Sequence, residues 1–309
     1  MTPAVETTEQ SFLGELFSHG LFIPSGVDGL YGRGMTFERV RNGVDALVTR
    51  FGAADEPETP RFPPVIPRRT LEQAGYLKSF PHLSGSVFSF AGNDAAAADL
   101  AETARRHGDW SHHLSRTDVV MLPAACYPAY PAMALRGPLP PGGVTLDLGG
   151  SYVFRNEPSS DPARLQMFHQ RELVRIGEAD HVLAWRETWM GRAREIFALL
   201  ELQAEIDVAS DAFFGRTGKL LANSQREQRL KFEVLVPIAR PEPTAAASFN
   251  FHQEHFGQSF GIRLFDGRPA NSACVGFGLE RITLALFRAH GMDLRTWPKE
   301  VRAQLELRT

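Results

Sequence analysis

Two segments of the chain carry arginine in settings suited to binding phosphate. The first, residues 144–177, has Arg155 and Glu157 at the end of a predicted strand, then a break rich in Pro, Ser and Asp, then Phe168. The second ends with Arg281, just after two glycines. A guanidinium can grip phosphate, a ring can stack on a base, and a carboxylate can accept a hydrogen bond from an exocyclic amine. These segments therefore indicate ATP chemistry without a P-loop.

Both arginines could instead form surface ion pairs, which is the commonest role of arginine. The position of Arg281 argues for phosphate, because Gly276 and Gly278 precede it where a strand is predicted to turn into a helix. Glycine allows close approach of the backbone, and the start of a helix is electropositive.

The elements predicted around these residues are strands with hairpin-type returns and long helices. Apolar residues at helical spacing predict a helix over 178–205, with Trp185 and Trp189 on its apolar face. The predicted strands cover residues 119–122, 150–155, 166–175, 231–238 and 247–253, and a strand from 275 leads into a helix that ends near 288. This order lacks regular βαβ crossovers, so it predicts an α+β fold, an antiparallel sheet flanked by helices.

The N-terminal part of the chain has a different sequence pattern, which predicts helices and a linker. Residues 9–51 predict a short helix, a Gly/Pro turn and a second, amphipathic helix, and residues 53–69 are rich in proline and acidic side chains, as linkers often are. We therefore expect an N-terminal helical appendage and linker over 1–69 and a catalytic domain over 70–309.

Composition excludes several classes of protein. The 309 residues carry a net charge of −3 and no run of five basic residues, which disfavours a polyanion such as tRNA as the partner. The first ten residues do not resemble a signal peptide, and no apolar stretch approaches the roughly 20 residues of a membrane span. Two cysteines far apart give no disulfide framework. We expect a soluble cytoplasmic protein with no membrane partner.

The two arginine segments resemble the second and third signature motifs of class II aminoacyl-tRNA synthetases, an Arg-x-Glu strand and a Gly-x-Gly-x-x-Arg turn into a helix. The wider pattern, with 211–216 and 223–228, is similar to the zinc-dependent seryl-tRNA synthetases of methanogens. It is closest to their truncated relatives, the amino acid:[carrier protein] ligases. The resemblance covers the chain from about Leu71 onward and implies a class II synthetase-like antiparallel sheet.

This resemblance implies roles for the residues of the nucleotide site. Arg155 would contact the α-phosphate and Arg281 the γ-phosphate of a bent ATP, which makes these two the catalytic pair. The other implied contacts are Glu157 with the adenine amine, Phe168 stacked on the base, and Arg164 with Leu165 in a flexible loop over the nucleotide.

The same resemblance implies that Cys126, Glu172 and Cys274 bind zinc. Two thiolates and a carboxylate with an open fourth position suit a catalytic zinc ion. Sequence spacing alone does not bring three distant segments together, and a lone cysteine is usually a small buried apolar residue. Zinc would bind the neutral α-amino group of an amino acid and so select amino acids over other carboxylic acids.

Ser248 and Asn250 match a Ser-x-Asn element that lines the substrate cleft of these relatives, although alternation with Phe249 and Phe251 also describes any half-buried strand. The acidic magnesium ligand expected a few residues upstream is missing, since the chain reads Thr244-Ala245-Ala246-Ala247. Mg²⁺ is expected with ATP, held largely by phosphate and water.

Three other motifs are interpreted as surface or packing features. The Gly-rich stretch 215–220 lacks the spacing of a Walker loop. His252-Gln253-Glu254-His255 is not a His-Glu-x-x-His helix, and His112-His113 has no partner at ligand spacing.

The segment before the predicted catalytic core indicates which molecule accepts the amino acid. Only about 69 residues do so, without a basic helical arm, so we expect no tRNA partner. The resemblance implies transfer of a small amino acid, glycine or alanine, to the phosphopantetheine thiol of an acidic carrier protein. Alternatives are an amino-acid-binding regulator built on a synthetase core, tRNA-dependent aminoacylation, or, less favoured, an asparagine- or biotin-type ligase.

Two further expectations concern surfaces. The resemblance implies a homodimer whose interface is built by residues 71–80. Carrier docking is expected at a basic segment, and Trp185, Trp189 and Phe277 are expected to supply bulk around the cleft. The basic side chains of that segment are Arg216, Lys219, Arg226 and Arg229.

Overall fold

A six-stranded antiparallel sheet forms the centre of the protein. The computed structural model describes residues 11–307, apart from the side chains of Arg216 and Thr217. The strands lie in the order β6-β7-β11-β10-β9-β8, and each of the five neighbouring pairs is antiparallel. Their bounds are β6 Val144–Phe154, β7 Met167–Gly177, β8 Glu205–Val208, β9 Lys231–Val236, β10 Thr244–Gln253 and β11 Asn271–Gly278. The predicted α+β class with an antiparallel sheet is confirmed.

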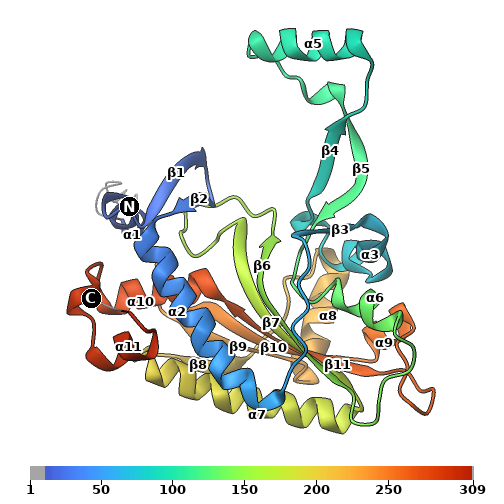
Figure 1. Cartoon of the computed structure of the whole chain (residues 1–309), viewed down its shortest axis with the longest axis vertical. Coiled ribbons are helices and arrows are strands. Elements are labelled where there is room, and N and C mark those ends of the chain that lie inside the picture. The colour runs from blue at the N-terminus through green and yellow to red at the C-terminus, as the bar shows by residue number, and fades with distance from the viewer. Residues whose placement is uncertain (1–10, 308–309) are drawn as a thin grey trace.

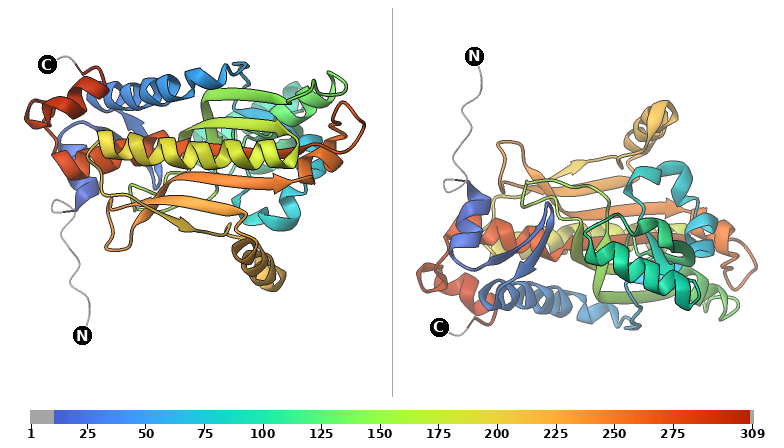
Figure 2. Two further views of the ribbon diagram at one scale, coloured as in Figure 1. Left: turned by 90° about the horizontal axis from the view of Figure 1, so that it is seen from below. Right: turned by 90° about the horizontal axis from the view of Figure 1, so that it is seen from above.

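Helices cover one face of this sheet. The long helix α7 (Ala179–Leu199) lies along it, α2 (Met35–Gly52) packs beside α7, and α10 (Leu279–His290) packs against α2 and the strands (Figure 2). Apolar side chains of α7, such as Trp189, meet apolar side chains of the strands, such as Phe277, and both are fully buried. Alternation along each strand sends one set of side chains into this core and leaves the next set for the opposite face.

The opposite face is partly covered by shorter elements. A second apolar cluster joins the strands to α3 (Arg68–Gln73), α4 (Tyr76–Ser79), α6 (Ala129–Ala134) and α9 (His255–Phe260). A small sheet of β3 (Val65–Pro67), β5 (Leu114–Met121) and β4 (Ser86–Phe90) extends from it as an arm, with α5 (Asp94–Arg105) at the tip (Figure 1). The predicted strand over 119–122 is thus only the inner end of β5.

The remaining described elements lie at the ends and edges. They are α1 Phe12–Ser18, β1 Phe22–Val27, β2 Leu30–Arg33, η2 Ala53–Asp55, η3 Pro81–Leu83, η4 Ser111–His113, α8 Gly215–Glu227, η5 Leu294–Thr296 and α11 Lys299–Gln304. No helix within residues 11–307 has the length and apolar character needed to cross a membrane.

The N-terminal helices share the core of the sheet. Phe12 of α1 and Val40, Val44 and Leu47 of α2 belong to the same buried cluster as the strand residue Phe249. The division into 1–69 and 70–309 remains a prediction; the packing joins the two parts through one hydrophobic core.

Asp55 fixes the segment between α2 and the sheet. Its carboxylate accepts hydrogen bonds from the indole Nε1 of Trp185 (2.9 Å) and of Trp189 (2.8 Å), and it pairs with Arg192 at 2.8 Å. Burial alone would raise the pKa of Asp55, but these hydrogen bonds outweigh it and the pKa is lowered. The ionised carboxylate therefore stabilises the fold.

Replacing Asp55 by asparagine is expected to lower the free energy of unfolding at pH 7 by about 2–3 kcal/mol, because Arg192 loses its buried partner. Since the folded pKa is depressed, this stabilisation exists above the ordinary carboxyl pKa of about 4 and is lost as pH falls through the folded pKa. Urea denaturation at pH 7 and pH 3 measures both effects. The control is Glu58→Gln, because Glu58 is half exposed and paired with the surface residue Arg136; a change under about 0.5 kcal/mol is expected there.

Candidate active site and metal centre

A cavity of about 1030 Å³ lies on the face of the sheet opposite α7. Alternate side chains of the central strands point into it, among them Glu172, Lys231, Ser248 and Cys274. Residues from α4, from the segment after β5 and from the β8–α8 connection form the other walls. Its size matches sites for ligands as large as a nucleotide with a second substrate.

One end of the cavity gathers Cys126, Glu172 and Cys274. Their ligand atoms all lie within 4.8 Å of one another, and all three residues are buried. Glu172 and Cys274 come from the neighbouring strands β7 and β11, where Glu172 is opposite Gly276 and thus diagonal to Cys274. The backbone N–H of Cys126 donates to Glu172 Oε2 at 2.7 Å. The fold brings together the three segments that sequence spacing alone could not.

This group has the chemistry of a zinc site. Burial raises the pKa of Glu172, and the neighbouring Cys126 thiol together with burial holds the pKa of Cys274 well above its usual value. Three buried acidic groups so close together disfavour one another's ionised forms, and a divalent cation would favour them. Two sulfurs and one carboxylate are ligands that zinc accepts, with one coordination position left for a substrate. The trio could therefore bind a metal.

Polar side chains lie next to the three candidate metal ligands. Asn250 Nδ2 donates to Cys274 Sγ at 3.4 Å, and His252 Nε2 lies 3.5 Å from the same sulfur. The other ring nitrogen of His252 is 3.0 Å from Ser272 Oγ. Burial lowers the pKa of His252 to about 3, so the imidazole is neutral at pH 7. The sequence interpretation assigned His252 to packing; it does pack against Phe256, but it also lines the cavity beside Cys274.

The other end of the cavity holds Arg155 and Arg281. Nε of Arg155 is buried and has no hydrogen-bond partner within the described part of the chain. Arg281 donates to the carbonyls of Ala163 (2.8 Å) and Ala245 (2.9 Å). Burial lowers the pKa of Arg281 to about 10, and the charge of Arg155 adds to this. Two partly buried guanidinium groups that repel each other are suited to an anionic ligand such as a phosphate chain.

The remaining predicted nucleotide residues are spread around this end. Arg164 lines the cavity and forms an ion pair with Glu157 at 2.6 Å. The guanidinium of Arg155 lies over the ring of Phe168, 5.9 Å from its centroid. Glu157, Phe168 and Leu165 are not among the residues that line the cavity, and Leu165 is buried in the core on the helix side. The Leu165 side chain therefore faces the core, and the place of Arg164 and Leu165 in a loop over the nucleotide stays a prediction.

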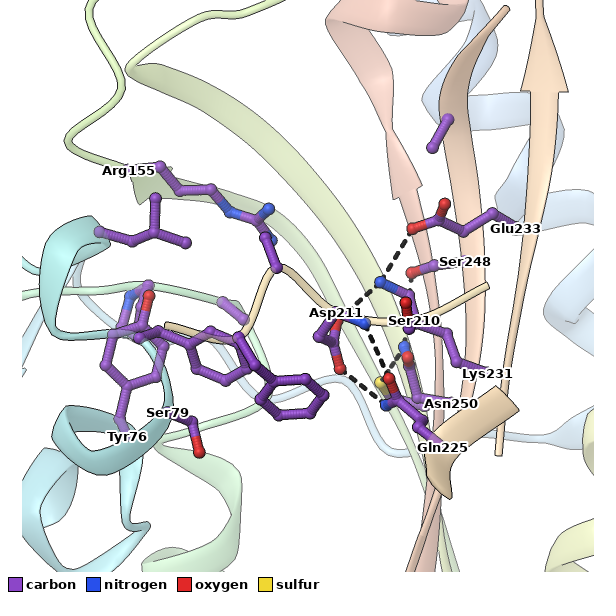
Figure 3. A pocket seen from close by; sticks show the side chains of 18 of the residues that line it. Tyr76, Ser79, Arg155, Ser210, Asp211, Gln225, Lys231, Glu233, Ser248 and Asn250 are labelled. Carbon is purple, nitrogen blue, oxygen red and sulfur yellow. Dashed lines mark hydrogen bonds and ion pairs between the residues drawn. The ribbon is translucent and has the colours of Figure 1, made fainter. Parts of the chain in front are cut away.

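Sequence analysis missed a charged group on the floor of the cavity. Lys231 Nζ pairs with Asp211 at 2.6 Å and with Glu233 at 2.8 Å, and Gln225 Nε2 donates to Asp211. Figure 3 shows this group opposite Arg155, with Glu233 next to Ser248. Burial would lower the pKa of Lys231, but its two carboxylate partners raise it overall. A Lys-x-Glu pattern on the predicted strand 231–238 was the available signal, since both side chains face the same side.

The aromatic wall of the cavity differs from expectation. Trp189 and Phe277 lie in the core on the helix side, and Trp185 packs against that core. The reason is alternation: on β11, Cys274 and Gly276 face the cavity, so Phe277 faces away. The rings that line the cavity are Tyr76, Phe80, Tyr127, Phe213, Phe251 and Phe256.

Comparison with known proteins identifies the family of the chain. No protein-family model matches it. It is 46% identical over 288 residues to amino acid–[acyl-carrier-protein] ligase 1 of Bradyrhizobium diazoefficiens, which covers 93% of this chain and 88% of the relative. The chain belongs to the amino acid–[acyl-carrier-protein] ligase family. Ligase 2 of the same organism is also 46% identical, over 93% of this chain and 86% of its own length.

More distant relatives of this ligase family are synthetases. The type-2 serine–tRNA ligase of Methanopyrus kandleri is 25% identical over 79% of the chain, which spans half of that protein. The solved seryl-tRNA synthetase of M. kandleri, in complex with an Aquifex aeolicus tRNA, superposes with a TM-score of 0.82 at 21% identity, over 99% of this chain and 62% of its own. Prolyl-tRNA synthetase of Giardia lamblia gives 0.67 at 13% identity, over 90% and 51%. The class II synthetase fold expected from the two motifs is confirmed.

Proposed function

We propose that the protein uses ATP to activate a small amino acid, glycine or alanine, and transfers it to the phosphopantetheine thiol of a carrier protein. The observation that carries this proposal is the single cavity with Cys126, Glu172 and Cys274 at one end and Arg155 and Arg281 at the other. An amino acid held at the first end can present its carboxylate to a phosphate chain held at the second. The relatives from B. diazoefficiens, named as amino acid–[acyl-carrier-protein] ligases, support the same reaction.

In the first step, a carboxylate oxygen of the amino acid forms a bond to the α-phosphorus of ATP, and pyrophosphate leaves. A zinc ion on Cys126, Glu172 and Cys274 would supply a position for the neutral α-amino group. Arg155 and Arg281 stabilise the negative charge on the phosphates, in a cavity wall where Arg155 Nε lacks another partner within residues 11–307. For the Mg²⁺ that accompanies ATP, Glu233 is an available acidic side chain, since it lines the cavity and is opposite Ser248 in the strand register.

In the second step, the pantetheine sulfur attacks the carbonyl carbon of the adenylate. The new bond is a thioester, AMP leaves, and the thiol gives up its proton. A mixed carboxylic–phosphoric anhydride reacts readily with a thiol held in line. Tyr127, next to Cys126 in the chain, and Phe256 add bulk to the wall of the same cavity, where their rings meet edge to face at 5.9 Å. This favours glycine or alanine over larger amino acids.

The carrier would dock at α8, which projects from the edge of the sheet (Figure 2). Phe214, Leu220 and Leu221 are exposed there, and Leu221 also lines the cavity. Lys219 is exposed, whereas Arg226 donates to Ser210 and Val208, and Arg229 lies over Phe232. The side chain of Arg216 lies outside the described residues. An apolar helix face with a basic residue, next to the cavity mouth, suits an acidic carrier that must deliver a flexible arm.

Two partner assignments complete the proposal. A homodimer with residues 71–80 in its interface is carried over from the class II synthetases. The acceptor is proposed to be a carrier protein and not tRNA, in line with the nearly balanced net charge of −3.

The test is amino-acid-dependent exchange between pyrophosphate and ATP, followed by transfer to a holo carrier protein. Glycine or alanine is expected to support exchange at least about 10-fold better than leucine or phenylalanine, since Tyr127 and Phe256 add bulk to the cavity wall. Lys219→Glu is expected to slow transfer by about 5-fold and leave exchange unchanged, because a charge reversal acts on docking alone. Lys299→Glu, on exposed α11 at the far end, is the matched control.

Contradicting results are distinct for each part. Exchange only with a large amino acid would overturn the substrate assignment. Charging of tRNA with no thioester on any holo carrier would favour tRNA-dependent aminoacylation. Amino acid binding without exchange would favour a regulator built on a synthetase core.

A further inference from the structure

The β1–β2 hairpin lies against the loop that joins β6 to β7, which carries Arg155 and Arg164. We propose that this hairpin positions the nucleotide-binding arginines, with Gly29 at its tip and Arg33 at its base as positioning residues. This inference rests on the proposed use of ATP, and it assigns to the N-terminal segment a part in the active site.

The tip of the hairpin is bonded to the end of the loop. Gln166, which is 8% exposed, donates its backbone N–H to the carbonyl of Gly29 at 2.7 Å and its side-chain Nε2 to the carbonyl of Asp28 at 2.8 Å. The carbonyl of Gln166 in turn accepts from the N–H of Arg155 at 2.8 Å. Gly29 is therefore two hydrogen bonds away from the backbone of Arg155.

The base of the hairpin is bonded to the start of α10. Arg33 pairs with Glu280 at 3.0 Å and donates to the hydroxyl of Tyr152 at 2.6 Å. Glu280 is 1% exposed, accepts the backbone N–H of His169 at 2.8 Å, and directly precedes Arg281. The hairpin thus reaches the neighbours of both arginines, Arg155 through its tip and Arg281 through its base.

The close contact between the tip of the hairpin and the loop favours glycine at position 29. Gly29 has φ +75°, and a Cβ there would lie 3.0 Å from the carbonyl oxygen of Arg164, 3.2 Å from Cγ of Gln166 and 3.3 Å from its backbone N. A methyl group would therefore require the loop to shift by a few tenths of an ångström. Gly26, in the same hairpin, has φ +85°, and a Cβ there would have no described heavy atom within 4 Å.

The functional consequence follows from preorganisation. A loop held in its binding conformation before ATP arrives loses less conformational freedom on binding. A loop released from the hairpin keeps its arginines but must be ordered by the ligand, so the affinity for ATP falls while binding at the metal end is unaffected.

The experiment compares Gly29→Ala with Gly26→Ala in the full-length protein. Both introduce Cβ at a positive φ, so both carry similar backbone strain, but only the first disturbs the loop. We expect Gly29→Ala to raise the KM for ATP in the exchange assay by about 10-fold, leaving the KM for the amino acid unchanged, because only the nucleotide end is disordered. Gly26→Ala should keep both values within about 2-fold of wild type.

A second readout does not depend on ATP. In the nucleotide-free protein, hydrogen exchange of amides in residues 157–166 should be about 10-fold faster in Gly29→Ala than in Gly26→Ala, since loop opening becomes easier. Gln166→Met, which removes only the amide bond to Asp28, should give a smaller increase in the same peptides and serves if Gly29→Ala does not fold.

The outcomes separate the two hypotheses. Equal hydrogen exchange and equal KM for ATP in the two glycine variants would overturn the positioning role. If wild type shows no ATP-dependent signal at all, the proposed function fails, whereas the hydrogen-exchange comparison still decides whether the hairpin orders the loop.

Discussion

Replacing Cys274 by alanine is expected to remove the bound metal and the activation of amino acids together. Cys274 supplies one of three ligand atoms that lie within 4.8 Å of one another, and two ligands cannot hold zinc tightly in a site open to substrate. Metal analysis should fall from about one zinc per chain to below about 0.1, and exchange should fall at least about 100-fold. Inductively coupled plasma mass spectrometry and the exchange assay measure the two losses.

The control for this prediction must show that the Cys274→Ala protein still folds. Removing a buried thiol leaves a small space, so circular dichroism must show an unchanged spectrum before the loss is interpreted. Treating wild type with a chelator should reproduce the loss of activity, and added zinc should restore it in wild type but not in the variant. An active Cys274→Ala protein that keeps one zinc per chain would exclude this trio as the metal site.

Replacing Arg155 by alanine is expected to lower kcat/KM for ATP by about 10²–10³-fold, the effect of removing one positioned donor from a developing charge. Arg155→Lys should lose about 10-fold, because an ammonium keeps the charge but not the planar fork that binds two oxygens. The exchange assay at varied ATP measures both. Zinc content should stay at the wild-type value, since Arg155 is not one of the three candidate metal ligands.

The matched control is Arg136→Ala. Arg136 is also an arginine, but it is about half exposed and pairs with Glu58 on the surface. Its loss should leave kcat/KM within about 2-fold of wild type, since a surface pair contributes little. If Arg155→Ala behaves like Arg136→Ala, Arg155 does not contact the nucleotide.

Local patterns were enough to predict the main elements. The apolar spacing over 178–205 corresponds to α7, which ends earlier, at Leu199, and the glycine-led exit from 275 corresponds to the end of β11 followed by α10. These predictions hold because a helix of 21 residues and a strand-to-helix glycine turn are set by side chains close in sequence. The β5 strand was predicted too short, because its outer half pairs with β4 in an exposed arm and lacks the apolar run used to find it.

Sequence by itself also determined which residues could do the chemistry: two cysteines, one glutamate and two arginines beside recognisable motifs. Tertiary structure alone decided that they share one cavity, because strand register and face alternation, not sequence distance, set which side chains meet. Face alternation on β11 also turns Phe277 into the core, whereas Leu165 packs into that core from the β6–β7 loop. Lys231 of β9 meets Asp211 of the β8–α8 connection on the floor of the cavity. The hairpin contact at Gly29 was likewise hidden, since its partner Gln166 lies 137 positions further along the chain.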